Sequence, residues 1–347
     1  MDMIIISVLM CVYNREKYLP AAIESILNQS FRDFEFVIVN DGSTDKSKKI
    51  LDAFAQRDSR INIIEEPKNV GIIQALTTGI RHCSGKYIAR MDSDDLSTPD
   101  RLQVQVDFME THPEVDILGS AYEIIDESGA YIGSFGSRPS DPKLTWFQMF
   151  YHSAIINGTI IAKAEVYKRF NQDKLEEGFT ACEDIAYFLR MGFDYTITNM
   201  NMVLYKIRTH RKQISDLKEN QQREGTVRAT QIALTRLFGV EIPGDVIKSY
   251  YYVLRFTVDN VQTNLQALHV MYHLQTIFEK RYKLNREQKT ETRRFTYERL
   301  KNYTMKYRKH LIVAGYGVIL LGFLMPAELI NNFVRRIFRR RSIICTI

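Results

Sequence analysis

The sequence has little cysteine and no recognisable secretory signal. Its four cysteines lie apart from one another, without the paired spacing of a zinc site, which fits a reducing compartment and provides no disulfide framework. An apolar run, Ile4 to Val12, begins almost at once, where a signal would need a basic region and a small-residue cleavage site. We therefore expect the amino-terminal part of the protein to stay in the cytoplasm.

Internal repeats, low-complexity linkers and long apolar runs are also scarce. A membrane-spanning helix needs roughly 20 apolar residues, and the stretch from Leu311 to Met325 falls slightly short of this before Pro326 and Glu328. What the chain does have is 347 residues of which 45% are hydrophobic, enough for a large domain and a smaller one. We expect one domain over residues 1–215, a helical region over 216–310 and a tail over 311–347.

Apolar strand-like runs alternate with amphipathic helices in the first part of the chain. Such alternation with short connections predicts an α/β fold with a mostly parallel sheet flanked by helices. In these sheets ligands bind outside the carboxyl ends of the strands. The expected strand and helix pairs are Ile4 to Val12 with Leu19 to Asn28, Phe34 to Asn40 with Lys46 to Arg57, Ile61 to Glu65 with Ile72 to Arg81, and Tyr87 to Arg90 with Asp100 to Thr111.

An acidic segment, Met91-Asp92-Ser93-Asp94-Asp95, follows the fourth expected strand. Carboxylates this close repel one another, so a cation is expected among them. Mg²⁺ takes carboxylate oxygens and commonly keeps substrate phosphates as further ligands, which would suit a diphosphate. Taken alone, the segment fits equally well a solvated acidic turn before the next helix.

Polar residues follow the other three strands as well. The first strand is followed by Tyr13, Asn14 and Arg15, the second by Asn40 to Asp45, and the third by Pro67, Asn69 and Gly71. Each group alone could be an ordinary turn, but together they predict one crevice. There, Asp41 suits the N–H edge of a base, Asp92 suits ribose hydroxyls, and Asp94 suits a metal ion.

These segments resemble the family 2 glycosyltransferases of the GT-A fold. The resemblance is carried, in matching order and spacing, by Val12-Tyr13-Asn14, Val39 to Asp45, Asn69-Val70-Gly71, Met91 to Asp95, Glu183-Asp184, and Arg208-Thr209-His210, which span roughly the first 215 residues. It implies the GT-A nucleotide-diphospho-sugar transferase fold, a nucleotide-diphosphate sugar donor, Mg²⁺ or Mn²⁺ as cofactor, and an inverting displacement by an acceptor hydroxyl.

The resemblance also implies roles for individual residues. Asp184 would be the catalytic general base, and Asp94, Glu183 and His210 would lie at the metal. Donor contacts would come from Val12, Tyr13, Asn14, Arg15, Asp41, Asn69, Gly71, Asp92, Ser93 and Arg208. Without the other motifs, the Glu183-Asp184 pair would equally suit the positive start of a helix. A lone histidine such as His210 could be structural, and Arg208 could be surface charge.

The chain departs from the family pattern at three points. Thr78 precedes Gly79 where a second asparagine is common, and Lys163 stands in a segment that often carries an arginine. The Gln-x-x-Arg-Trp motif of processive synthases is absent, since the only tryptophan is Trp146. We therefore expect the addition of a single sugar, or of few sugars, in place of polymer extrusion.

The chain has a formal net charge of +6, and its basic residues are concentrated toward the carboxyl end. Arginines from Arg335 to Arg341 follow the apolar stretch Leu311 to Met325, a combination that favours an anionic membrane surface as partner and no nucleic acid. We expect peripheral or monotopic attachment at the cytoplasmic face of the inner (plasma) membrane. A single short span and a buried helix with a basic tail are the alternatives.

The sequence thus predicts a glycosyltransferase that acts on a lipid-linked saccharide acceptor in cell-surface glycan assembly, such as O-antigen or capsule. A UDP-sugar is the family-typical donor, with dTDP- and GDP-sugars open. A non-catalytic nucleotide-sugar-binding scaffold is the alternative from another class, although both Asp94 and Asp184 are present. A nucleic-acid-binding protein is a third possibility, and the apolar stretch Leu311 to Met325 argues against it.

Overall fold

The computed structural model describes residues 4–135, 139–172, 179, 182–210, 219–254 and 261–306. It divides the chain into two compact units, Met1–Thr226 and Val227–Ile347. The expected domain boundary near residue 215 stays a prediction. The expected membrane-docking tail, residues 311–347, lies outside the described residues.

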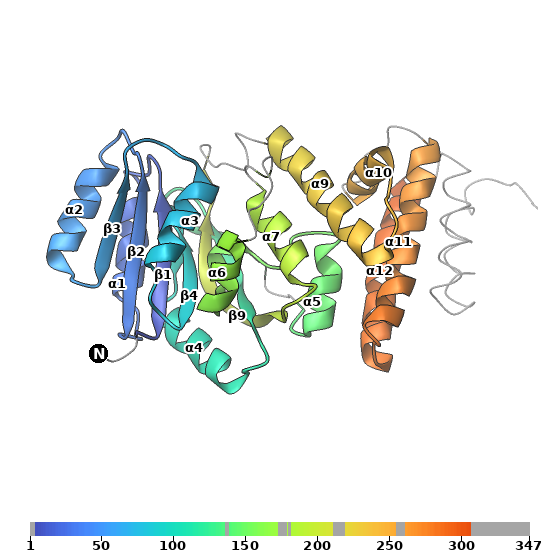
Figure 1. Ribbon diagram of the computed structural model, residues 1–347, viewed down its shortest axis with the longest axis horizontal. Coiled ribbons are helices and arrows are strands. Elements are labelled where there is room, and N and C mark those ends of the chain that lie inside the picture. Colours follow the sequence, from blue (N-terminus) through green and yellow to red (C-terminus); the bar gives the residue numbers. More distant parts are fainter. Residues whose placement is uncertain are drawn as a thin grey trace, which may run out of the picture. The chain divides into compact units, whose positions relative to one another are not determined.

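The first unit is built on a nine-stranded sheet flanked by helices (Figure 1). The strands are β1 (Ile6–Val12), β2 (Phe34–Asp41), β3 (Ile61–Glu66), β4 (Tyr87–Asp92), β5 (Leu96–Ser97), β6 (Ile117–Ile125), β7 (Tyr131–Phe135), β8 (Ile161–Lys163) and β9 (Ile197–Arg208). The helices are α1 (Leu19–Leu27), α2 (Ser47–Arg57), α3 (Ile72–His82), α4 (Arg101–Thr111), α5 (Pro142–Met149), α6 (Ala164–Gln172) and α7 (Glu183–Met191), with a short 3-10 helix η1 (Asn157–Thr159).

The first four strands form the parallel part of the sheet, in the order β3-β2-β1-β4. The register sets Val12 of β1 opposite Asn40 of β2 and Cys11 of β1 opposite Asp92 of β4. The carboxyl ends of these strands therefore lie side by side at one edge. The four expected strand and helix pairs are confirmed, although several ends differ: the first strand begins at Ile6 in place of Ile4, and the fourth continues through Asp92 in place of Arg90.

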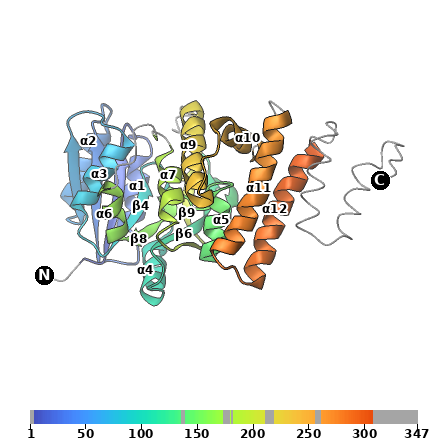
Figure 2. The ribbon, with the colours of Figure 1, turned by 45° about the vertical axis from the view of Figure 1, so that its right-hand side comes forward.

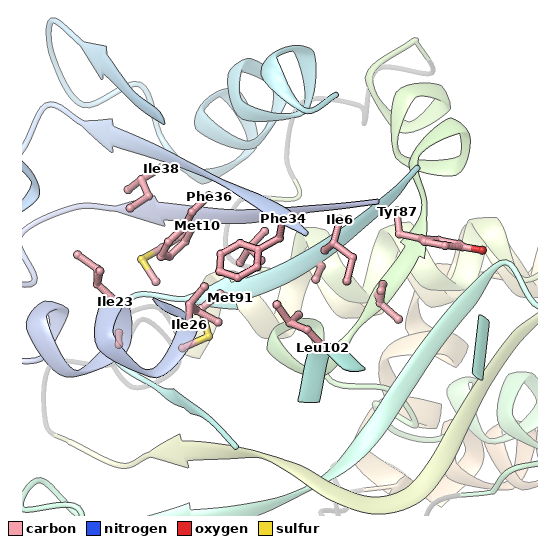
Figure 3. Close-up of a cluster of buried hydrophobic side chains, with 14 of the residues drawn as sticks. Ile6, Met10, Ile23, Ile26, Phe34, Phe36, Ile38, Tyr87, Met91 and Leu102 are labelled. Carbon is pink, nitrogen blue, oxygen red and sulfur yellow. The ribbon is translucent and has the colours of Figure 1, made fainter. Parts of the chain in front are cut away.

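Alternation along β1 divides the core between the two faces of the sheet, because successive side chains of a strand point to opposite sides. Met10 belongs to one buried cluster with residues of α1 and α4, and Figure 3 shows it near Phe36 and Ile23. Leu9 faces α3, whose Gly79 lies so near that an added Cβ would be 2.4 Å from Leu9 Cδ1. Each fully buried aliphatic side chain contributes about 1.5–3 kcal/mol to stability.

The second half of the sheet is mainly antiparallel and was not predicted. β8 runs antiparallel to both β4 and β6, while β9 lies parallel to β6 and antiparallel to β5. From β4 the strand order continues as β8-β6-β9-β5, so β5 lies at the edge opposite β3. β7 pairs with β6 outside this order. This arrangement returns the end of β9, with Tyr205 and Arg208, to the acidic segment after β4.

The second unit is helical, as the sequence predicts. The helices of this part of the chain are α9 (Glu219–Phe238), α10 (Gly244–Leu254), α11 (Val261–Arg281) and α12 (Arg286–Lys306). α11 and α12 run side by side (Figure 2), joined by hydrogen bonds from Gln275 to Thr292 and from Thr296 to Gln275. α9 stops before Gly239, which has a φ of +75°, as expected for a helix end.

The apolar residues of α9 do not all lie on its buried face. Leu234 and Leu237 of α9 are buried, but Ile232 is 48% exposed. Helical spacing places Ile232 only two residues from Leu234, so the two side chains project in different directions from the helix. Within the described ranges, no helix combines the length and the apolar content that a membrane crossing requires.

Candidate functional site

The loop after β1 is fixed by the loop after β2. Asn14 adopts a left-handed backbone conformation with a φ of +53°, which asparagine tolerates better than most residues. Its Oδ1 accepts hydrogen bonds from the backbone N–H groups of Thr44 and Asp45, at 2.8 and 3.4 Å. The N–H of Arg15 donates to Ser47 Oγ at 2.9 Å. Tyr13, at the tip, is 43% exposed.

Asp41, the last residue of β2, organises the loop after β3. Its buried carboxylate accepts from the N–H groups of Val70 at 2.6 Å and Gly71 at 3.1 Å, and from Asn69 Nδ2 at 3.0 Å. The structure therefore brings together Asp41, Asn69 and Gly71, as expected. An ionised carboxylate offers about four acceptor sites, so the carboxylate of Asp41 keeps acceptor capacity beyond these contacts.

The acidic segment after β4 is held by β9. The backbone N–H of Asp92 donates to the Tyr205 hydroxyl at 3.1 Å, and Asp95 Oδ1 accepts from the N–H of Arg208 at 2.7 Å. Burial raises the pKa of Asp92, and the charges of Asp94 and Asp184 raise it further against the opposing effect of Arg90. Arg90 Nη2 lies 3.6 Å from Asp92 Oδ1.

Asp94 contacts both Arg15 and His210. Its Oδ2 lies 3.2 Å from Arg15 Nε and 3.1 Å from His210 Nε2. The His210 ring is buried and packs on the ring of Tyr18, with centroids 4.9 Å apart. The Tyr18 hydroxyl donates in turn to Glu127 Oε2 at 3.1 Å. The contact with Tyr18, which Glu127 holds in turn, therefore fixes the orientation of the His210 ring toward Asp94.

Arg208 holds the loops of the site through backbone carbonyls. Its Nε donates to Asp94 O at 2.9 Å, and its Nη1 donates to the carbonyls of Asp126 and Glu127 at 3.1 and 3.2 Å. The guanidinium also lies over the Tyr18 ring, 5.0 Å from its centroid. These contacts give Arg208 a positioning role, while its direct contact with a donor stays a prediction.

Glu183 and Asp184 form the first turn of α7. Asp184 Oδ1 accepts from the N–H of Ile185 at 2.8 Å. Burial raises the pKa of Asp184, with the charge of Arg90 opposing the rise. Burial, and next the charge of Asp184, raise the pKa of Glu183 to about 7. Because the charge of Asp184 acts on Asp92, the start of α7 belongs to the same acidic cluster as the end of β4.

The residues of this cluster fit a divalent ion. In the part of the chain that the structure describes, no three His, Cys, Asp or Glu side chains converge to hold a metal by themselves. Mg²⁺ needs no such cage, because it is commonly bound by one or two carboxylates with water and substrate phosphates. Asp94 and His210, which contact each other, would form such a partial site, and the surrounding carboxylates add negative charge. Glu183 as a further ligand stays a prediction.

Several residues of the site were missed by sequence reasoning. Tyr18 and Glu127 orient His210, Tyr205 binds Asp92, and Arg90 is a buried cation beside it. Gly158 of η1 packs so tightly that an added Cβ would lie 2.5 Å from the Tyr205 hydroxyl and 2.8 Å from Asp92 Oδ2. No local sequence pattern marks these residues, because their contacts join distant parts of the chain.

We expect Gly158→Ala to destabilise the protein by about 1–3 kcal/mol, because the new methyl group overpacks the buried Tyr205. Urea unfolding measures the change. The matched control is Gly133→Ala in β7, where an added Cβ would meet nothing within 4 Å. Equal unfolding midpoints for the two variants would contradict the packing described here.

The sequence of this chain is similar to those of known glycosyltransferases. The family model described as Glycosyl transferase family 2 matches residues 7–171. An uncharacterised glycosyltransferase of Haemophilus influenzae is 28% identical over 78% of this chain and 92% of its own length. EpsE of Bacillus subtilis, named as a putative glycosyltransferase, is 33% identical over 58% of this chain and 72% of its own length.

Solved structures share the fold. TarS of S. aureus, residues 1–349 in complex with UDP-GlcNAc, superposes with a TM-score of 0.58 at 15% identity, covering 92% of this chain and 91% of that one. Mannosyltransferase PcManGT from Pyrobaculum calidifontis, in complex with GDP-Man and Mn²⁺, has a TM-score of 0.51 at 16% identity, covering 83% and 82%. The expected GT-A fold is thereby confirmed.

Proposed function

Because the chain belongs to glycosyl transferase family 2, we propose that this glycosyltransferase moves a single sugar from a nucleotide-diphosphate donor to a hydroxyl of a lipid-linked saccharide, with inversion. The observation that carries the proposal is the convergence of Asp41, Asp92 and Asp94 at one edge of the parallel strands, with Asp184 added by α7. The place of the reaction would be cell-surface glycan assembly.

In this proposal the donor lies across the carboxyl edge of the sheet. Asp41 accepts from the base, near Asn69 and Gly71, and Asp92 accepts from the ribose. Tyr13, which is 43% exposed, would border the donor site, and Val12 and Ser93, both buried, would lie behind it. A UDP-sugar is the first candidate, supported by the complexes of TarS with UDP-GlcNAc and with UDP. The GDP-Man complex of PcManGT keeps GDP-sugars in the test.

Asp94 and His210 would hold the Mg²⁺ or Mn²⁺ ion, and Glu183 is proposed beside them. When bound, such an ion neutralises the charge that develops on the departing diphosphate. The Mn²⁺ in the PcManGT complex supports this choice of cofactor. Arg208 would act through Asp94, because its guanidinium holds the Asp94 carbonyl.

Asp184 would act as the general base. A sugar hydroxyl is a poor nucleophile until a carboxylate accepts its proton. As the proton passes to Asp184, the hydroxyl oxygen bonds to C1 of the donor sugar from the side opposite the diphosphate. The bond from C1 to the diphosphate oxygen breaks with its electron pair, so the configuration at C1 inverts. A pKa raised by burial makes Asp184 a stronger base than an exposed aspartate.

A transfer assay tests this proposal. The purified protein is incubated with Mn²⁺, a panel of UDP-, dTDP- and GDP-sugars, and lipid-linked saccharides extracted from bacterial membranes. We expect one donor to release nucleoside diphosphate in step with acceptor glycosylation, and NMR of the product to show the inverted anomer. Donor binding without transfer to any acceptor would favour the scaffold alternative, and a retained anomer would contradict inversion.

We also propose that the protein works at the cytoplasmic face of the plasma membrane. The support comes from the sequence, in the apolar stretch Leu311 to Met325 and the arginines that follow it. Both lie outside the described residues. A docked enzyme would meet lipid-linked acceptors at the surface where they are made.

Deletion of residues 311–347 is expected to abolish sedimentation of the protein with phosphatidylglycerol vesicles, because it removes the proposed apolar and basic docking segment. Neutral phosphatidylcholine vesicles provide the control for the electrostatic part. If the truncated protein sediments as completely as the full chain, the docking segment lies elsewhere.

A further inference from the structure

Arg15 and His210 both contact one oxygen atom of Asp94. Arg15 Nε lies 3.2 Å from Asp94 Oδ2, and His210 Nε2 lies 3.1 Å from the same atom. Asp94 is also the residue proposed to hold the metal. An ion bound through Oδ2 would therefore occupy space that these two side chains fill and would replace the positive charge of Arg15.

A metal ion bound through Asp94 Oδ2 would affect the two side chains differently. Imidazole can present a lone pair from Nε2 and become a ligand, whereas guanidinium carries donors only and stays charged. His210 is also the more firmly held, since its side chain is 3% exposed and packs on Tyr18. The Arg15 side chain is more exposed, at 16%, so a metal ion on Asp94 Oδ2 would displace Arg15 before His210.

The backbone around Arg15 stays in place during such a change. The N–H of Arg15 donates to Ser47 Oγ, and Asn14 is tied to Thr44. The remaining contacts of the guanidinium are long, from Nη1 to the carbonyls of Tyr13 and Asn14 at 3.4 and 3.3 Å. The side chain can therefore rotate away from Asp94 while the loop after β1 keeps its shape.

We propose that Arg15 is an exchangeable counter-ion that couples metal binding to donor binding. In the metal-free protein its guanidinium neutralises Asp94. When a divalent cation takes that carboxylate, the guanidinium turns to the diphosphate, whose oxygens match its planar donor fork. This inference rests on the proposed function, because it requires a diphosphate at the metal.

The exchange has opposite effects on the two ligands. Arg15 opposes the binding of metal alone, since the metal must break its ion pair with Asp94. Arg15 assists the binding of a nucleoside diphosphate once the metal is present. Metal and nucleotide should therefore bind with positive coupling, and by linkage each should raise the affinity of the other by the same factor.

The test measures Mn²⁺ binding by electron paramagnetic resonance, first without nucleotide and then with UDP or GDP, in the wild type and in Arg15→Gln. For Mn²⁺ alone, we expect Arg15→Gln to bind about five-fold more tightly, the factor of a single partly exposed ion pair. With Mn²⁺ present, its affinity for the nucleoside diphosphate should fall about ten-fold. Arg15→Lys should restore the weaker Mn²⁺ binding, because it keeps the charge.

Arg57→Gln is the matched control. It makes the same change of side chain at the exposed carboxyl end of α2, where the guanidinium lies over the Phe54 ring and not on Asp94, so neither affinity should change. Mn²⁺ affinity for Arg15→Gln equal to or weaker than that of the wild type would overturn the exchange. A wild type that binds Mn²⁺ but no nucleoside diphosphate would overturn the proposed function as well, and the wild-type titration alone distinguishes that case.

Discussion

Asp184→Asn should lower the rate of sugar transfer about a thousand-fold while leaving donor affinity nearly unchanged. The loss follows from removing the group that accepts the hydroxyl proton, which supplies about 10²–10⁴ of rate. The fold should survive, because an asparagine side-chain oxygen can still accept from the N–H of Ile185 as Asp184 does at 2.8 Å. Turnover with saturating donor and calorimetry with the same donor measure the two effects separately.

Glu183→Gln is the informative partner variant, since it changes the adjacent acid in the same turn of α7. If Glu183 were the base, the larger loss of turnover would move to that variant. An Asp184→Asn protein with a turnover close to that of the wild type would refute the assignment of Asp184. A parallel fall in donor affinity would indicate a metal or donor role for Asp184 in place of proton transfer.

Asp94→Ala should remove metal-dependent donor binding. Mutations that only disturb the partners of a metal ligand typically cost 10–100-fold in metal affinity, so we expect a loss of at least about 100-fold for the ligand itself. Donor affinity measured with Mn²⁺ should then fall to the value of the wild type in a chelator. Calorimetric titration of donor at fixed Mn²⁺ concentration measures this change.

The control for Asp94→Ala is Asp107→Ala, which makes the same change of charge on the exposed surface of α4. It should leave both metal and donor affinities as they are. If Asp94→Ala binds the donor as tightly as this control, and still requires Mn²⁺, the metal lies on other residues and the account of Asp94 is wrong.

The parallel half of the fold could be predicted because its signals are local. The segment Phe34 to Asn40 is mostly apolar, and Asp41 and Gly42 follow it. A buried strand and the turn after it can therefore be recognised within a few residues. Parallel neighbours then bring the carboxyl ends of the strands to one edge. The convergence of Asp41 and Asp92 follows from that topology.

The rest of the site depends on contacts that no local pattern encodes. Tyr205 reaches Asp92 from a strand far along the chain, and Tyr18 packs on His210 from the start of α1. The antiparallel strands β6 and β8, which are irregular or short, gave no period-2 signal long enough to recognise. Arg208 was predicted by resemblance as a donor contact, yet the structure adds a backbone-holding role that its position in a motif does not reveal.

The central claim is that the edge formed by β1, β2 and β4 binds a nucleotide-diphosphate sugar together with a divalent ion. Calorimetry of the full chain against UDP-, dTDP- and GDP-sugars, with Mn²⁺ and again with chelator, tests it most directly. The account predicts that sugars of one nucleotide bind with Mn²⁺ and that chelator greatly weakens this binding. Folded protein that binds none of the donors, or binds one equally well in chelator, would contradict it.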